Sequence, residues 1–506
     1  MPTNLIQQHS DTTRILAFCW DTRPVATSYT ELVKYFRQNY HCEFYIVTNG
    51  PLAEDIFVKN GIISWSIQEI VSSLADLPPQ IEAKHIDKII EYDRAVGWQV
   101  LPLDMSPYAP HEMELYYSWA AERMVTAYRF LFKNVRPSIV FNWNGIAAMQ
   151  AALTLVAEEH GTPCYFMERG LLPETLVMDE QGVNFSSHIA GPNWLRVRPP
   201  MPLAEEIKMV EEYCARLQAE GKTIVAVGDM MNPEKVRDHL NVSAKALIIL
   251  FPLQIEWDSN ILKYSPVYTK MLDVIKDLQE VVAELENAVL VVKPHPEDKD
   301  RLTELQVACG SNGRLSTDLS INSLLDVADV VVTINSTVGL EALVRHKPVV
   351  ALGQSIYSGK GFTYDVSSRD LLPVQLKTAI GDSKKGIFMT AEFHRFLVYL
   401  LKHCLFRFQG EDTWNSRENI AKKVISRKSD KKGNDSSKTF LTLLERDYSK
   451  SHSLYQEIQA EICKETAANA ALNQRIEELL CSKSWRITAP LRWLHGTLAG
   501  FRVVKN

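Results

Sequence analysis

Short, nearly continuous apolar runs recur through the first part of the chain and alternate with helical patterns. Residues 112–134 and 146–160 have helical spacing, and the apolar runs around them read R-I-L-A-F-C, E-F-Y-I-V, S-I-V-F-N-W and C-Y-F-M-E. Strands that are apolar on both faces and separated by helices form parallel sheets that are covered on both sides. Residues 14–200 are therefore predicted to form one such sheet with its helices.

A second set of the same kind follows. Its apolar runs are A-L-I-I-L-F, A-V-L-V-V, D-V-V-V-T-I and P-V-V-A-L, all within residues 246–352. Between the two sets, the segment V-R-P-P-M-P at residues 197–202 has the prolines of a hinge. The sequence thus predicts an α/β protein with two Rossmann-like domains facing a cleft, residues 1–200 and 201–407.

The composition changes after residue 407. Residues 408–439 are polar and basic and are predicted to form a linker. Residues 440–506 contain an apolar stripe that predicts a coiled-coil helix and self-association through it: Leu454, Ile458, Ile462, Leu472, Ile476 and Leu480. The final segment S-W-R-I-T-A-P-L-R-W-L combines tryptophan with arginine, which fits an amphipathic tail against a membrane surface or a partner helix.

Charge and hydropathy argue against several classes of protein. The formal net charge of −6 argues against a nucleic-acid partner. No run approaches the roughly 18 apolar residues of a membrane span, and the polar N-terminus shows no apolar core of a secretion signal. The eight cysteines are scattered without a C-x-x-C pair, a pattern typical of reduced thiols in the cytoplasm. We therefore expect a cytoplasmic protein.

Polar residues gather where three strands of the second domain end. In open parallel sheets, ligands bind beyond the carboxyl ends of the strands. The three runs lead into P-L-Q-I-E-W-D-S-N, K-P-H-P-E-D and N-S-T-V-G-L-E-A-L. These loops should meet at one edge of the sheet and present Gln254, Glu256, Asp258, Lys293, His295, Asn335, Ser336 and Thr337.

This group of residues predicts a site for a phosphate. Hydroxyls and backbone amides at a helix start, residues 335–337, favour an anion, although an ordinary helix N-cap has the same pattern. Two prolines hold His295 on extended backbone next to Lys293. A histidine and a lysine facing the helix start make a cationic pocket that needs no metal, and we expect the phosphate of a nucleotide leaving group there.

Three motifs of the second domain resemble the bacterial capsule polysaccharide synthesis proteins. They read K-P-H-P-E-D, I-N-S-T-V-G-L-E-A-L-V-R-H-K-P-V-V-A-L-G and S-I-Y-S-G-K-G-F-T-Y-D, and they agree in order and spacing. Those proteins are glycosyltransferases with two Rossmann-like domains (GT-B type) that use a CMP-sugar. The loop P-L-Q-I-E-W-D-S-N is similar to the nucleophile-bearing loop of the retaining β-Kdo transferases among them, and C-Y-F-M-E-R-G-L-L-P-E-T-L resembles their strand that ends in a functional glutamate.

The resemblance, over roughly residues 14–400, implies a role for each matching position. Asp258 would be the nucleophile that forms a glycosyl-enzyme adduct, and Glu168 the acid/base that deprotonates the acceptor. The CMP phosphate would be held by His295 with Lys293, Asn335, Ser336 and Thr337, and Glu341 would reach the cytidine ribose. Retention needs two displacements, and hence a carboxylate on each side of the reacting carbon.

The resemblance also implies substrates and partners. The donor would be CMP-β-Kdo, with no cofactor and no metal, and the acceptor a lipid-linked O-antigen or capsule polysaccharide of a Gram-negative bacterium. The protein would then work on the cytoplasmic face of the inner membrane as a peripheral protein.

Several alternatives stay open at this point. Asp258 alone fits a loop N-cap, Glu168 fits a solvated strand end, and Glu256 is a second carboxylate on the same loop. F-N-W-N-G (141–145) and W-D-T-R-P (20–24) could bind sugar hydroxyls or be turns only. The rival functions are an inverting CMP-sialic-acid transferase, a CDP-glycerol glycerophosphotransferase and a non-catalytic scaffold.

Overall fold

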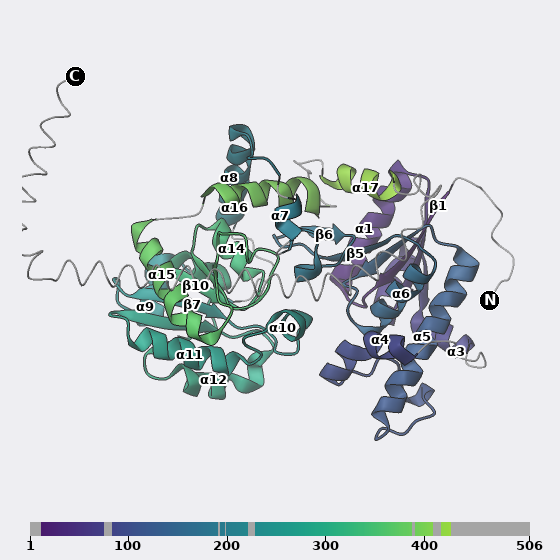
Figure 1. Ribbon diagram of the computed structural model, residues 1–506, viewed down its shortest axis with the longest axis horizontal. Helices are drawn as coiled ribbons and strands as arrows, with labels where there is room; N and C mark the ends of the chain where they lie inside the picture. Colours follow the sequence, from purple (N-terminus) through teal and green to yellow (C-terminus); the bar gives the residue numbers. More distant parts are fainter. Residues whose placement is uncertain are drawn as a thin grey trace, which may run out of the picture. The chain divides into compact units, whose positions relative to one another are not determined.

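The computed structural model describes residues 12–74, 83–190, 193–197, 199–220, 228–386, 390–407 and 416–426 (Figure 1). The chain divides into two compact units, residues 1–435 and 436–506. The predicted coiled coil and amphipathic tail fall in the second unit and lie outside the described residues. None of the helices in the described part of the chain is long and apolar enough to cross a membrane.

The first sheet has seven strands in the order β13-β6-β5-β4-β1-β2-β3. Strands β1 to β5 are parallel, whereas β6 is antiparallel to β5 and β13 is antiparallel to β6. The bounds are β1 (Thr13–Cys19), β2 (Cys42–Thr48), β3 (Ile63–Ser66), β4 (Ile139–Trp143), β5 (Cys164–Arg169), β6 (Leu176–Asp179) and β13 (Leu405–Phe406). The four predicted strands correspond to β1, β2, β4 and β5.

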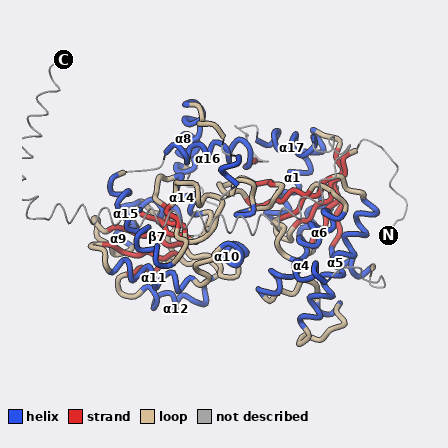
Figure 2. Tube along the Cα trace, viewed as in Figure 1, coloured by secondary structure: helices blue, strands red, loops and turns tan. Residues whose placement is uncertain are grey.

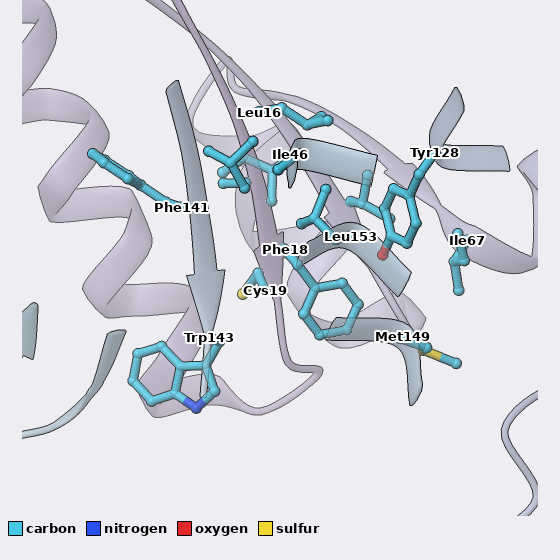
Figure 3. Close-up of a cluster of buried hydrophobic side chains, with 14 of the residues drawn as sticks. Leu16, Phe18, Cys19, Ile46, Ile67, Tyr128, Phe141, Trp143, Met149 and Leu153 are labelled. Atoms are coloured by element: carbon cyan, nitrogen blue, oxygen red, sulfur yellow. The ribbon is translucent and has the colours of Figure 1, made fainter. Parts of the chain in front are cut away.

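Helices cover this sheet, as the tube in Figure 2 shows. They are α1 (Arg23–Asn39), α2 (Pro51–Lys59), α3 (Ile67–Ser73), α4 (Ala83–Val96), α5 (Met113–Val135) and α6 (Ala148–Glu159). Helix α7 (Asn193–Val197) follows later in the chain, and its buried Trp194 belongs to a different core cluster. The predicted helices at 112–134 and 146–160 are α5 and α6. Figure 3 shows part of the core, in which Phe18 of β1, Phe141 of β4 and Leu153 of α6 are fully buried. Each such side chain stabilises the fold by about 1.5–3 kcal/mol.

The second sheet has six strands in the order β12-β11-β10-β7-β8-β9, and all its pairings are parallel. The bounds are β7 (Leu247–Pro252), β8 (Ala288–Lys293), β9 (Gly313–Leu315), β10 (Val330–Thr333), β11 (Val349–Ala351) and β12 (Tyr364–Asp365). Along β7, Ile248 and Leu250 belong to one core cluster, and Ile249 and Phe251 to another. Because side chains alternate along a strand, the central strand is buried on both faces. The predicted doubly covered sheet is confirmed.

Helices α8 (Ala204–Ala219) and α9 (Pro233–His239) precede this sheet. The helices that follow are α10 (Ser259–Tyr264), α11 (Met271–Ala283), α12 (Leu302–Cys309), α13 (Ile321–Val327), α14 (Val338–Val344), α15 (Leu372–Lys385), α16 (Thr390–Tyr399) and α17 (Ser416–Ser426). The fold class read from the sequence, α/β with two Rossmann-like domains, is confirmed.

The end of the described chain returns to the first domain, which the sequence did not predict. Leu405 and Phe406 of β13 pair with β6, and the buried side chains of α17 lie in the core of the first domain: Ile420, Ala421 and Val424. Figure 1 shows α17 beside α1, where the Arg417 guanidinium lies 5.4 Å from the centre of the Tyr35 ring. The prediction of a linker over 408–439 is therefore wrong for residues 416–426. The sequence did not predict α17 because its short apolar stripe, although it has helical spacing, lies among many basic residues.

Candidate functional site

A cavity of about 640 Å³ lies beyond the carboxyl ends of β7, β8 and β10, and residues of both Rossmann-like domains line it. Every residue that the sequence singled out as catalytic or nucleotide-binding is in its wall. They are Glu168, Asp258, Lys293, His295, Asn335, Ser336, Thr337 and Glu341. The structure thus brings these eight residues to one place, while their chemical roles stay predictions.

The first loop, after β7, places Asp258 at the start of α10. The Asp258 carboxylate accepts a hydrogen bond of 2.7 Å from the backbone N–H of Asn260, so it caps the helix. Burial raises the pKa of Asp258, and the Asn260 N–H and the charges of His295 and Arg169 oppose that shift. Asp258 therefore caps α10 and is also part of the cavity wall.

Glu256, the alternative carboxylate, points elsewhere. It accepts hydrogen bonds from the backbone N–H of Met271 at 2.8 Å and from the Lys270 ammonium at 3.0 Å, and it is not in the cavity wall. In an extended loop, residues two apart share a face. The turn at residues 256–258 is what separates Glu256 from Asp258.

The second loop, after β8, fixes the ring of His295. Its Nδ1 accepts a 3.2 Å hydrogen bond from the backbone N–H of Glu297, and its own backbone N–H donates to Asp298 at 2.9 Å. Because Nδ1 accepts, the proton of the neutral ring is on Nε2. Burial lowers the pKa of His295, against the opposing charges of Asp298, Glu297 and Asp258. The ring therefore presents its Nε2–H at the edge of the cavity.

Lys293 is the last residue of β8, two positions before His295. Its ammonium donates to the backbone carbonyl of Thr317 at 3.2 Å, and only 9% of the residue is exposed. Burial lowers the pKa of Lys293, and the charge of Asp318 opposes this shift. An anion in the cavity would stabilise the protonated form.

The third loop, after β10, is held by a network of amides. Gln254 donates to the Asn335 side-chain oxygen at 2.9 Å, and the Asn335 side-chain nitrogen donates to the Asn260 carbonyl at 2.8 Å. Both ends of the Asn335 amide are thus engaged inside the protein, and its part in the site is to position the three loops. The sequence had assigned Asn335 to the nucleotide, and Gln254, which it left without a role, is the residue that links β7 to β10.

Ser336 and Thr337 follow at the start of α14. The Ser336 hydroxyl accepts from the backbone N–H of Val338 at 3.2 Å. Within the described part of the chain, neither the amide nor the hydroxyl of Thr337 has a hydrogen-bond partner. Tyr357 closes this side by donating to the Ser336 carbonyl at 2.6 Å, and a Cβ on Gly339 would lie 2.3 Å from the Tyr357 hydroxyl. Glycine at 339 is what allows this contact.

The first domain contributes Glu168 at the end of β5. Its carboxylate accepts a 2.8 Å hydrogen bond from the Asn144 side chain and a 2.9 Å bond from the backbone N–H of Arg169. Burial raises the pKa of Glu168, these two bonds oppose it, and the charge of Asp258 raises it further. The charge of Asp258 therefore acts on Glu168, and both carboxylates are in the cavity wall.

Asn144 and Arg169 are further residues of the site. The sequence left the segment of Asn144 open between sugar binding and a turn, and it gave Arg169 no role. Asn144 and Gly145 both have positive φ, 63° and 84°, and a Cβ on Gly145 would lie 2.4 Å from the Phe166 ring. The asparagine-glycine pair in F-N-W-N-G was the available signal, because both residues tolerate this backbone conformation. This segment is thus a turn that also holds Glu168.

Two residues of the segment W-D-T-R-P make different structural contacts. Asp21 accepts a 2.6 Å hydrogen bond from the backbone N–H of Ala53 and so holds the start of α2. Trp20 instead joins a group of aromatic rings near Asp258. In the part of the chain that the structure describes, no three His, Cys, Asp or Glu side chains are arranged to hold a metal ion.

Residues 208–394 match the family profile described as capsule polysaccharide biosynthesis protein. This is a smaller range than the motifs suggested, and Glu168 lies outside it. Among curated proteins, the capsule polysaccharide modification protein LipA of Neisseria meningitidis serogroup B is 32% identical over 136 residues, which are 26% of this chain and 18% of LipA. The capsule polysaccharide export protein KpsS of Escherichia coli is 34% identical over 122 residues, 22% of this chain and 31% of KpsS. The chain spans less than half the length of the curated relatives it matches.

Among solved structures, the chain is similar to KpsC of Thermosulfurimonas dismutans, described as a beta Kdo 2,7 transferase. The identity is 22%, the TM-score is 0.35, and the match covers 55% of this chain and 89% of that one. Residues 208–394 are thus similar to the capsule polysaccharide biosynthesis family, the family that the three motifs of the chain resemble.

Proposed function

We propose that this protein is a retaining glycosyltransferase that moves Kdo from CMP-β-Kdo to an O-antigen or capsule polysaccharide acceptor. The observation that carries the proposal is the composition of the cavity wall. Two carboxylates, Asp258 and Glu168, come from different domains, and a group of hydrogen-bond donors, His295, Lys293 and Thr337, lies on neighbouring loops of one domain.

The group of donors suits a CMP leaving group. Fixed donors and dipoles that face a developing negative charge stabilise it without reorganisation. The Nε2–H of His295, the Thr337 amide and the Lys293 ammonium would bind the phosphate oxygens as the bond to the sugar breaks. Ser336 would assist through its hydroxyl, and Glu341, buried on α14, would bind the cytidine ribose.

The two carboxylates suit a double displacement. The Asp258 carboxylate would attack the anomeric carbon, form an ester to Kdo and release CMP with the electron pair of the broken C–O bond. Glu168 would then take the proton of the acceptor hydroxyl, whose oxygen attacks the same carbon and frees Asp258. A raised pKa of Glu168 makes its carboxylate a stronger base for the proton of the acceptor hydroxyl.

The remaining parts of the proposal concern partners. The reaction would use no cofactor and no metal, and the acceptor would be a lipid-linked glycan at the cytoplasmic face of the inner membrane. Residues 440–506 would mediate self-association and contact with that membrane.

The donor is tested by CMP release. The protein is incubated with CMP-Kdo, CMP-sialic acid or CDP-glycerol, and the release of the nucleotide is measured for each. We expect turnover with CMP-Kdo. Turnover with CMP-sialic acid or CDP-glycerol alone would replace this proposal by an inverting sialyltransferase or a glycerophosphotransferase, and no turnover with any of them would favour a scaffold.

The mechanism is tested by trapping the ester. In Glu168→Gln the second displacement is slow, while Asp258 can still expel CMP. Intact-protein mass spectrometry with CMP-Kdo and no acceptor should then show one added Kdo, mapped to the peptide that contains Asp258. An adduct on another residue would contradict the role of Asp258.

A further inference from the structure

Four aromatic side chains form a cluster beside the cavity, which we call the aromatic platform: Trp20, Tyr92, Trp98 and Trp257. The Trp98 ring lies 6.4 Å from Trp20 in a stacked arrangement, 5.4 Å from Tyr92 and 5.6 Å from Trp257 between centroids. Three of these residues belong to the first domain, whereas Trp257 is in the loop after β7 of the second. None of the four lines the cavity itself.

The platform is fixed to the edge of the cavity. Trp257 immediately precedes Asp258, and the Tyr92 hydroxyl donates to the Trp257 carbonyl at 3.3 Å. Burial raises the pKa of Tyr92, and the charge of Asp258 raises it further. A group bound on the platform would therefore lie next to the Asp258 carboxylate, on the side of the first domain.

The platform also leaves aromatic surface in contact with water. Trp257 is 47% exposed, and Trp20 and Trp98 are partly exposed. Large aromatic side chains bury much of their surface in cores and interfaces, and clustered rings left open to solvent mark a binding surface. The cationic and hydrogen-bonding groups that suit a nucleotide lie on other loops, after β8 and β10.

We propose that the aromatic platform binds a pyranose ring of the acceptor glycan, with the sugar stacked on half-exposed Trp257. One face of a pyranose presents C–H bonds, which a flat aromatic ring can cover, while the hydroxyls around the ring edge stay free to meet Glu168 and water. This inference rests on the proposed function, since only a glycosyl transfer needs an acceptor sugar at that position.

The test compares Trp257→Leu with Trp257→Phe. Leucine removes the flat ring and phenylalanine keeps one, and half-exposed Trp257 tolerates either without loss of the core. The matched control is Trp65→Ala, because Trp65 is also a partly exposed tryptophan, stacked on Tyr45 at 5.9 Å, but it lies on β3 at the far edge of the first sheet. Saturation-transfer NMR is recorded with the methyl glycosides of Kdo, N-acetylglucosamine and galactose, and CMP binding is measured by calorimetry on the same samples.

We expect at least one glycoside to receive saturation at its ring C–H protons in the wild type. Its affinity should fall about tenfold in Trp257→Leu and much less in Trp257→Phe, with CMP binding unchanged in both. Three results would overturn the inference: no saturable binding of any glycoside to the wild type, equal affinity in Trp257→Leu, or a loss of CMP binding in that variant. Release of CMP from CMP-Kdo by the wild type tests the proposed function separately, so a failure of one is distinguishable from a failure of the other.

Discussion

The two walls of the cavity are built in different ways. The wall from the second domain consists of three loops that each follow a strand directly, and it supplies seven of the eight residues that the sequence assigned to the site. The wall from the first domain supplies Glu168, and the groups that hold it are Asn144 and the backbone of Arg169. In the proposed reaction the wall from the second domain binds the donor, and the wall from the first domain binds the acceptor.

The difference shows that the loops of one sheet form one wall, whereas contacts between separate elements form the other. In the second domain, β7, β8 and β10 are neighbours in one parallel sheet, so their loops must meet whatever the rest of the chain does. In the first domain, Glu168 is held by the turn that contains Asn144, and the proposed acceptor platform includes a tryptophan of the opposite domain. Variants in the two walls should therefore affect different half-reactions.

The largest expected effect on activity comes from replacing the two carboxylates, Asp258 and Glu168, one at a time. Asp258→Ala should lower both CMP release and transfer by at least about a thousandfold, because no nucleophile remains. Glu168→Gln should lower transfer about a hundredfold while a single turnover of CMP release survives. Quenched-flow measurement of CMP and of product distinguishes the two. Asp300→Ala, which removes an exposed aspartate outside the cavity, is the control, and full transfer by Asp258→Ala would end the double-displacement mechanism.

The second effect belongs to the donor wall alone. His295→Ala should lower kcat/KM for CMP release about a hundredfold, since the Nε2–H donor to the phosphate is lost. His295→Gln, which has an amide donor at a similar reach, should recover part of that loss. Unchanged CMP release in His295→Ala, with a thermal unfolding curve like that of the wild type, would exclude the phosphate role.

The third effect belongs to the acceptor wall and depends on pH. Glu168 must be ionised to accept a proton, and its pKa is already raised by burial, so activity is lost as pH falls through that raised pKa. The hydrogen bond from Asn144 lowers the same pKa. Asn144→Ala should therefore move the acidic limb of the transfer profile to higher pH, with about a tenfold loss in mildly acidic buffer and less in alkaline buffer.

A pH series of initial transfer rates checks this prediction. Asn134→Ala on the exposed side of α5 is the matched control, since its side chain bonds only to the carbonyl of Phe130. A uniform loss at every pH would mean that Asn144 positions the turn without tuning Glu168.

The fourth effect concerns stability and the return of the chain to the first domain. Val424 on α17 is fully buried, whereas Val374 on α15 is 47% exposed. Val424→Ala should lower the free energy of unfolding by about 1 kcal/mol and Val374→Ala by less than about 0.5 kcal/mol. Urea unfolding measures both. Equal values would show that α17 does not stabilise the first domain.

Removal of metal ions is expected to have no effect on activity. EDTA should leave CMP release and transfer unchanged, because the donors of the second-domain wall supply the positive field that a metal would otherwise provide. Loss of activity that Mg²⁺ restores would show that the phosphate site was misread.

The sequence predicted much of this molecule, and its errors are instructive. The apolar runs identified β1, β2, β4 and β5. The strand-end loops identified seven residues of the cavity wall and one, Glu256, that is not in it. The short strand β13 and helix α17 were missed, because two residues of strand and a helix in a basic segment give little periodic signal. No pattern along the chain indicates that both ends of the Asn335 amide are engaged inside the protein, and its assignment to the nucleotide stays a prediction.

What the sequence determined by itself was the parallel sheets and the motifs at their strand ends, because hydrophobic periodicity and loop residues act over short distances along the chain. The tertiary structure alone decided which groups face one another. It placed Glu168 beside Asn144, turned Glu256 away from the cavity to the start of α11, and joined Trp257 to Trp98. The physical reason is that hydrogen bonds, burial and ring contacts between distant residues depend on how two separately folded sheets pack, and no local pattern encodes that packing.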